Sequence, residues 1–340
     1  MRVKSERLNG LPNNMGLPQI GVCGWYGHNN IGDESYKLSF PKILSKYNCI
    51  FSEQPIPDIT NVLGGGDVVS DYFVDLMSVC KKKHILSASF SKPFSHIKDY
   101  KIIALRDMDS LVNASASGLQ PIYCPDFAFA LNGNPINGKA LLKNHFDGLE
   151  LYAKVIAVVI NAHMLPEYLG ITNYRDFISF EYFSNILAQL IDNTMASFVF
   201  LPFSTQNPWD DRVPNAWIAA KCKFPTKNTV IYDRLSVEDT IDIISACNLV
   251  ISTRLHSTIF SCSLNTPFID ITHNHKNKAF LDTVGLSKYS LPISSFSYDM
   301  MKYKIQQSLF QGDSIRQELK EVADKQKIIL KRFSDYVCLD

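Results

Sequence analysis

The segment from Ser252 to Ser257 (STRLHS) carries side chains that could bind an anion and move a proton. The apolar residues 248–252 before it predict a short strand, and the apolar spacing of the residues after it predicts a buried helix. Arg254 and His256 would therefore open that helix, where exposed N–H groups and the helix dipole favour negative charge. An arginine also grips a carboxylate or phosphate with two N–H groups. Taken alone, Arg254 and His256 fit a local ion pair and a buried structural histidine better than they fit a ligand site. The choice between these two interpretations depends on other parts of the chain.

Two glycine-rich loops follow other predicted strands. The strand at 19–23 runs into the loop 24–34 (GWYGHNNIGDE), and the apolar run at 59–63 runs into Gly64-Gly65-Gly66. The first loop is not GxGxxG and has no P-loop lysine, which excludes the usual dinucleotide and nucleoside-triphosphate sites. Glycines nevertheless let the backbone approach a ligand closely. Asp33, at the start of the next predicted helix, is either a catalytic base or an ordinary helix cap.

Strands and helices alternate along most of the chain, which predicts an α/β fold with parallel sheets. A length of 340 residues, 46% of them apolar, is enough for two domains. We assign Rossmann-like domains to residues 1–140 and 150–340. They would be joined by the Gly-, Asn- and Pro-rich stretch 132–148, with the second domain starting near Leu151. Apolar residues at helical spacing predict an amphipathic C-terminal helix over 314–337.

Charge and cysteine usage exclude several classes of protein. The formal net charge is +1, from 34 basic and 33 acidic residues, so the chain lacks the excess of basic residues that is typical of nucleic-acid-binding proteins. The eight cysteines form no CxxC pairs and are interpreted as small buried apolar side chains. The first sixteen residues lack the apolar core of a signal peptide, and no window reaches the ~18 apolar residues of a membrane span. We therefore expect a cytoplasmic protein.

The unusual residues all follow predicted strands. In open parallel sheets, ligands bind outside the carboxyl ends of the strands. The first domain offers both glycine loops and Arg106 at such ends, and the second offers Arg254, His256 and the segment 273–276. Two sheets facing across a cleft would bring these groups together, as in glycosyltransferases of the GT-B type.

These motifs resemble the polysaccharide pyruvyl transferase family. The resemblance runs from about residue 19 to residue 286 and rests on an ordered set of short motifs. They are GWYGHNNIGDE at 24–34, GGG at 64–66, RDMDS at 106–110, DFAF at 126–129, RLH at 254–256, and Lys276 followed by Gly285-Leu286.

The resemblance implies a reaction and roles for residues. A pyruvyl group would move from phosphoenolpyruvate onto a sugar as a ketal, with release of phosphate. Arg254, Arg106 and Lys276 would bind the donor from both sides of the cleft, and His256 would transfer a proton. Asp33, on the opposite domain from His256, would activate the acceptor hydroxyl. The acceptor loops would contribute Gly27, Asn30, Gly32, Glu34, Gly65 and Gly66.

The chain departs from the family pattern in two places. His273-Asn274-His275 stands where the family tends to have Tyr-Asp-Pro, and Asn161-Ala162-His163 stands where an arginine is common. His273 and His275 alternate as a metal pair would, but no third ligand has comparable spacing, so we predict neither a metal nor a cofactor.

Two other functions fit the same fold. A nucleotide-sugar glycosyltransferase or epimerase would use similar loops and should prefer a nucleoside diphosphate. A non-catalytic glycan- or phosphate-binding protein would not need a titratable histidine beside the arginine. The sequence leaves the acceptor sugar open, whether free, nucleotide-linked or lipid-linked; a lipid-linked acceptor would bring the protein to a membrane surface.

Overall fold

The structure of the chain is a computed structural model that describes residues 16–93, 97–145, 152–164 and 179–339. Contacts divide the chain into two compact units. The first comprises residues up to Gly27, Tyr36–Ala130 and residues from Ile328, and the second comprises His28–Ser35 and Leu131–Lys327. The N-terminal segment, the end of the expected linker (146–148) and the expected start of the second domain at Leu151 lie outside the described residues.

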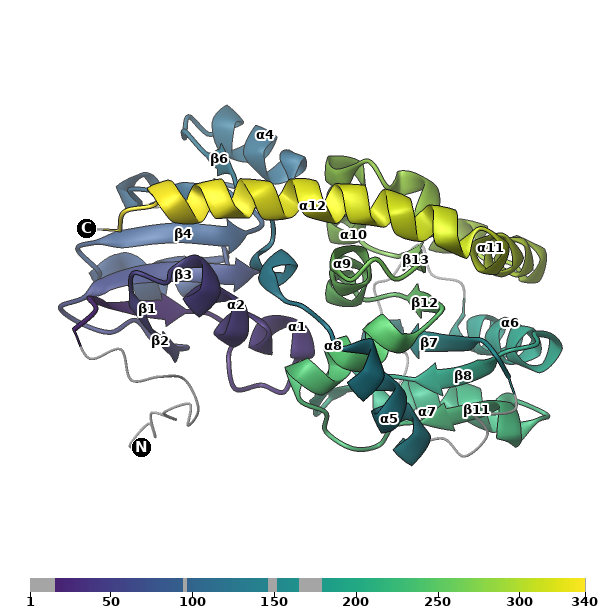
Figure 1. The fold of residues 1–340 in the computed structure, drawn as a ribbon. Coiled ribbons are helices and arrows are strands. Elements are labelled where there is room, and N and C mark those ends of the chain that lie inside the picture. Colours follow the sequence, from purple (N-terminus) through teal and green to yellow (C-terminus); the bar gives the residue numbers. More distant parts are fainter. Residues whose placement is uncertain (1–15, 94–96, 146–151, 165–178, 340) are drawn as a thin grey trace. The chain divides into compact units, whose positions relative to one another are not determined.

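The first unit is built on a parallel sheet in the order β2-β1-β3-β4-β5-β6 (Figure 1). Its strands are β1 (Gln19–Cys23), β2 (Asn48–Ser52), β3 (Thr60–Gly66), β4 (Lys83–Ala88), β5 (Ile103–Leu105) and β6 (Ile122–Tyr123). Its α-helices are α2 (Tyr36–Ile43), α3 (Asp71–Leu76) and α4 (Met108–Ala116). The inner strands β4 and β5 are buried along their whole length, as expected for a parallel sheet covered on both faces.

The second unit holds a parallel sheet in the order β11-β8-β7-β12-β13-β14. Its strands are β7 (Val155–Val159), β8 (Ser197–Phe200), β11 (Asn228–Val230), β12 (Leu249–Ser252), β13 (Phe268–Thr272) and β14 (Ser290–Pro292). Counted within the unit, this order is 3-2-1-4-5-6, the doubly wound Rossmann order, in which the chain reverses direction across the sheet between the first and fourth strands. That switch point lies between β7 and β12.

Helices and a short hairpin complete the second unit. The helices are α1 (Ile31–Glu34), α5 (Pro135–His145), α6 (Phe180–Asn193), α7 (Arg212–Lys221), α8 (Val237–Ala246), α9 (Leu255–Ser263), α10 (His275–Val284) and α11 (Tyr298–Phe310). The hairpin pairs β9 (Thr205–Gln206) with β10 (Trp209–Asp210) in antiparallel fashion. The long helix α12 (Gly312–Tyr336) begins in the second unit, and its last turns belong to the first.

The structure confirms the α/β class, the two parallel sheets and the C-terminal helix, and it forms a helix within the expected linker. Residues 135–145 of that stretch form helix α5, which packs against α8 (Figure 1). Pro135 suits the first turn of a helix because its missing N–H has no partner there. Gly138 is required by the packing, since a Cβ at this position would lie 2.0 Å from the carbonyl oxygen of Asp242.

Candidate functional site

The ends of β7 and β12 meet at the switch point of the second unit. The N–H of Thr253 donates to the carbonyl of Val159 (2.9 Å), and the N–H of Asn161 donates to the Thr253 hydroxyl (2.7 Å). Ser252 makes the turn from β12 into α9, because its hydroxyl accepts the N–H of Arg254 (2.8 Å). These bonds hold Arg254 at the N-terminal end of α9, in the position that the sequence predicts.

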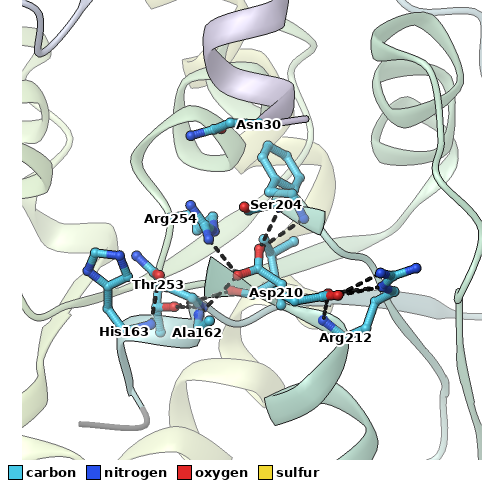
Figure 2. A network of polar contacts seen from close by, with 12 residues as sticks. Asn30, Ala162, His163, Ser204, Asp210, Arg212, Thr253 and Arg254 are labelled. Atoms are coloured by element: carbon cyan, nitrogen blue, oxygen red, sulfur yellow. Dashed lines mark hydrogen bonds and ion pairs between the residues drawn. The ribbon is translucent and has the colours of Figure 1, made fainter. Parts of the chain in front are cut away.

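Asp211 fixes the direction of the Arg254 side chain. This carboxylate is fully buried, and it accepts a hydrogen bond from Nη2 of Arg254. It also accepts the backbone N–H groups of Ala162 (2.9 Å), Phe203 (3.0 Å) and Ser204 (2.9 Å). One carboxylate therefore ties the segments that follow β7, β8 and β12 to each other, as Figure 2 shows around Arg254, Ala162 and Ser204.

The Nε atom of Arg254 is buried and has no hydrogen-bond partner among the described residues. A buried N–H donor without a partner costs about 1–3 kcal/mol, which an anion bound at this edge of the guanidinium would remove. The α9 and α10 helices also begin beside each other, because they follow the neighbouring strands β12 and β13. Their N-terminal ends add positive potential to the same region.

Two histidines lie near Arg254 and are uncharged at neutral pH. Burial lowers the pKa of His163 to about 4, with further contributions from the positive charges of Arg254 and Lys276. Burial likewise lowers the pKa of His273 to about 4, again assisted by Arg254 and Lys276. Lys276 is exposed in the first turn of α10. The positive charge of this cluster at pH 7 therefore comes from Arg254 and Lys276, while the imidazoles remain neutral hydrogen-bonding groups.

These pKa values predict that acid weakens the fold. An unfolded histidine titrates near pH ~6.5, so between about pH 6.5 and about pH 4 the unfolded chain binds protons that the folded chain does not. The free energy of unfolding should therefore fall as the pH falls through this window. His273→Gln should reduce the drop in melting temperature between neutral and mildly acidic buffer. An equal drop in wild type and His273→Gln would contradict this account.

The segment His28–Ser35 packs against the second unit, although its neighbours on both sides belong to the first. The N–H of Ile31 donates to the carbonyl of Phe203 (2.8 Å), and the N–H of Thr205 donates to the carbonyl of Asn29 (3.2 Å). Asn30 pairs with Ser204 as a β-bridge, and its side chain caps α1 by accepting the N–H of Gly32 (3.1 Å). Asp33 and Glu34 follow in the single turn of α1.

This packing corrects the expectation that Asp33 faces His256 from the opposite domain. Gly32 lies directly against His256, since a Cβ at Gly32 would be 2.2 Å from Nδ1 of the imidazole. The loop and the histidine therefore belong to one unit, with Asp33 next in the chain to the point of contact. Asn30, and not Asp33, is the N-cap of α1. The ring of His256 also lies near Phe260, with a centroid distance of 6.1 Å.

Comparison with known proteins places the chain in a family. The sequence profile of the family described as polysaccharide pyruvyl transferase matches residues 24–275, which include both the α1 loop and the Arg254–His256 motif. The chain belongs to the polysaccharide pyruvyl transferase family. It is also 21% identical over 326 residues to the amylovoran biosynthesis protein AmsJ of Erwinia amylovora, a match that covers 88% of this chain and 74% of that protein. The family and this relative support a transferase in polysaccharide biosynthesis.

Solved structures with a similar fold include enzymes that bind nucleotide sugars. A UDP-GlcNAc 2-epimerase from Neisseria meningitidis, bound to UDP-GlcNAc, matches with a TM-score of 0.56 and 10% identity, covering 93% of this chain and 99% of that one. HepE from Anabaena, in complex with UDP and glucose, matches with a TM-score of 0.55 and 10% identity, covering 94% and 98%. At this identity the likeness establishes the GT-B-like fold alone.

In this pyruvyl transferase family member, Arg106 is engaged inside the first unit. Its side chain is 4% exposed and pairs with the buried carboxylate of Asp126 (2.8 Å). It also donates to the hydroxyls of Tyr36 (3.0 Å) and Ser89 (2.9 Å). Burial by itself lowers the pKa of Arg106, but Tyr36, Asp126 and Asp107 together raise it above its usual value. We therefore interpret Arg106 as a structural ion-pair partner and leave it out of the donor site proposed below.

Two glycines of the run at the end of β3 pack against aromatic rings. A Cβ at Gly64 would lie 2.4 Å from the Phe40 ring, and one at Gly65 would lie 2.4 Å from the Tyr36 ring. Gly65 and Gly66 also adopt positive φ values of 82° and 83°. Gly27, with φ of 86°, is the last residue of the first unit before the chain enters α1.

Sequence reasoning missed Asp211 and gave His163 no role. Asp211 lies between β10 and α7, outside every motif that the sequence singles out. No local signal separates this carboxylate from a surface acid.

Among the described residues, no helix is long and apolar enough to cross a membrane. Over the same ranges, no three His, Cys, Asp or Glu side chains gather to hold a metal ion.

Proposed function

We propose that this protein transfers the pyruvyl group of phosphoenolpyruvate to a sugar of a polysaccharide or glycan precursor, forming a pyruvate ketal and releasing phosphate. The observation that carries the proposal is the partly buried side chain of Arg254 at the switch point. Asp211 holds one of its nitrogens, while its Nε has no protein partner in the described part of the chain. Such an arrangement suits a carboxylate or phosphate, and phosphoenolpyruvate carries both.

The donor site would combine Arg254 with Lys276 and the beginnings of two helices. Lys276 is close enough to Arg254 that both shift the pKa of His163 and of His273. The neutral imidazoles would add hydrogen bonds without adding charge. Because Arg254 and Lys276 supply positive charge for the phosphate, we expect turnover without added divalent ions.

The chemistry requires one proton donor and one base. The methylene carbon of phosphoenolpyruvate takes a proton, and a sugar hydroxyl attacks the central carbon of the resulting cation and loses its own proton. The bond from that carbon to the phosphate oxygen breaks, and a second hydroxyl closes the ketal ring with loss of a second proton. Of the two hydroxyl protons, one balances the proton added to carbon and the other leaves with phosphate.

His256 and Asp33 are the groups that we assign to these proton transfers. His256 is partly exposed in the first turn of α9, two residues after Arg254, and Asp33 follows the glycine that touches its ring. We propose His256 as the acid toward the methylene carbon and Asp33 as the base toward the acceptor hydroxyl. The two residues belong to the same unit, so their pairing does not depend on motion between units.

Thermal stabilisation tests the donor assignment, since a ligand that binds the folded state at 100 times its Kd adds about 2.7 kcal/mol. Phosphoenolpyruvate should raise the melting temperature of the wild type more than UDP or a UDP-sugar does. Arg254→Ala and Lys276→Ala should each weaken phosphoenolpyruvate binding by about 10- to 100-fold, the range for a lost hydrogen bond to a charged group.

Lys278→Ala is the matched control for these variants. Lys278 lies on the same helix, is exposed and pairs with Asp282 across one helical turn. Its removal should leave the phosphoenolpyruvate-induced shift unchanged. A wild-type shift with UDP alone would overturn the proposal in favour of a nucleotide-sugar glycosyltransferase, and a shift that survives both substitutions would remove Arg254 and Lys276 from the donor site.

A further inference from the structure

The hairpin β9–β10 places an aromatic side chain beside the Arg254 cluster. The indole of Trp209 lies over the imidazole of His163, with ring centroids 4.1 Å apart and planes tilted by 41°. His163 is in turn close enough to Arg254 for the guanidinium to shift its pKa. Trp209 is partly exposed, so the indole lies at the edge of the site and is accessible to a ligand.

The hairpin is held firmly at its base. Asp211, the carboxylate that orients Arg254, also accepts the N–H groups of Phe203 and Ser204, just before β9. On the other strand, Asp210 forms a two-pronged ion pair with Arg212 (Figure 2). The Arg212 guanidinium also donates to the carbonyl of Tyr232 (2.9 Å). Trp209 is therefore carried on a hairpin with fixed ends, next to the group that we assign to the donor.

The polar groups of the hairpin suit a ligand with many hydroxyls. The Gln206 amide nitrogen lies 3.5 Å from Nδ1 of His28, at the start of the loop that carries Gly32 and Asp33. The charges of Asp210 and Arg212 satisfy each other. An indole face flanked by an amide and imidazoles is the chemistry that recognises a pyranose, whose C–H face packs on an aromatic ring while its hydroxyls bond to neutral polar groups.

We propose that Trp209 is the platform for the acceptor sugar, with His163 supporting the indole from one side. The identity of the bound sugar as the acceptor rests on the proposed function. The binding of a pyranose by the hairpin does not depend on it. Placed on this platform, a sugar ring would lie next to Arg254, the residue that we assign to the donor. Trp209 is thus a specificity-determining residue, and it takes no part in the proton transfers.

Fluorescence of Trp209 tests the platform directly. The chain has three tryptophans, so the double variant Trp25→Phe/Trp217→Phe leaves Trp209 as the single indole. Methyl glycosides of galactose, mannose, N-acetylmannosamine and glucuronic acid serve as probes. At least one should change the Trp209 emission in a saturable way. Trp209→Ala should weaken binding of that glycoside, followed by calorimetry, by about tenfold or more, equivalent to about 1.4 kcal/mol.

Two further variants test whether the loss of glycoside binding is specific to the aromatic ring at position 209. Trp209→Phe keeps a ring over His163 and should bind the glycoside with intermediate affinity. Trp217→Ala removes a 52% exposed tryptophan on α7 and should leave glycoside binding unchanged. Equal weakening by Trp209→Ala and Trp217→Ala would overturn the platform.

Donor binding distinguishes failure of this inference from failure of the proposed function. Trp209→Ala should retain the thermal shift with phosphoenolpyruvate. If the wild type shows that shift but no glycoside changes Trp209 emission, the platform is wrong and the proposed donor stands. If glycosides bind through Trp209 but phosphoenolpyruvate gives no shift, the platform stands and the proposed donor is wrong.

Discussion

Replacing Asp211 by asparagine is expected to lower the melting temperature by about 10 °C, since breaking a buried ion pair costs about 3–5 kcal/mol. All the partners of this carboxylate are donors: three backbone N–H groups and Arg254. An asparagine amide group would have to point its own N–H atoms at some of them. The same change should also weaken phosphoenolpyruvate binding, because Arg254 loses the group that orients it.

Asp210→Asn is the control for this prediction. Asp210 is the neighbouring residue and pairs with Arg212, but both side chains are partly exposed. Partly exposed pairs contribute about 0–1 kcal/mol, so this variant should melt within a few degrees of the wild type. If Asp211→Asn melted like Asp210→Asn, the carboxylate would not stabilise the strand ends. If it lost stability but bound phosphoenolpyruvate normally, Asp211 would be structural and would not position the donor ligand.

His256→Ala is expected to lower turnover by about 100-fold or more, the range for loss of a general acid. Phosphoenolpyruvate should still stabilise this variant, because Arg254 and Lys276 remain. The measurement is phosphate release in the presence of acceptor, together with the melting temperature with and without donor. A buried structural histidine would give the opposite pattern, with stability reduced by about 1–3 kcal/mol and turnover retained in the folded fraction.

Gly32 provides a second, independent measurement on the same histidine. Gly32→Ala would put a methyl group 2.2 Å from Nδ1 of His256, so the ring or the loop must move. Turnover should fall and the melting temperature should drop. In the double variant Gly32→Ala/His256→Ala the ring is gone, and the stability cost of the alanine at position 32 should largely disappear. If the stability cost of the double variant instead equals the sum of the costs of the two single variants, this contact does not constrain the loop.

The local features of the second unit could be predicted from the sequence because they depend on near neighbours. Residues 249–252 and 268–272 are rich in apolar side chains, and the alternation of such strands with helices predicts parallel pairing. The placement of Arg254 and His256 at the start of α9 follows from the same local order. The rule that ligands bind at the carboxyl ends of parallel strands then indicates the edge of the sheet at which we propose the donor site.

Other features depend on distant contacts, which the local sequence does not show. Asn, Gly and Pro between 132 and 148 indicate a linker, yet Gly138 is the residue that lets α5 approach the backbone of α8. The glycines of β3 suggest a ligand loop, but the rings of Tyr36 and Phe40 occupy the space beside them. A glycine that faces a ligand and one that faces an aromatic ring have the same sequence signal, because both simply lack a Cβ.

The sequence by itself determined the fold class, the family and the motif at Arg254 and His256, since apolar periodicity and short motifs are local properties of the chain. Only the tertiary structure decided which groups surround that motif. It brought residues 28–35 against His256, buried Arg106 in an ion pair, and placed Asp211 beneath Arg254. The reason is that a buried carboxylate, a docked loop and a close ring contact are fixed by partners from 20 to more than 200 residues away in the chain.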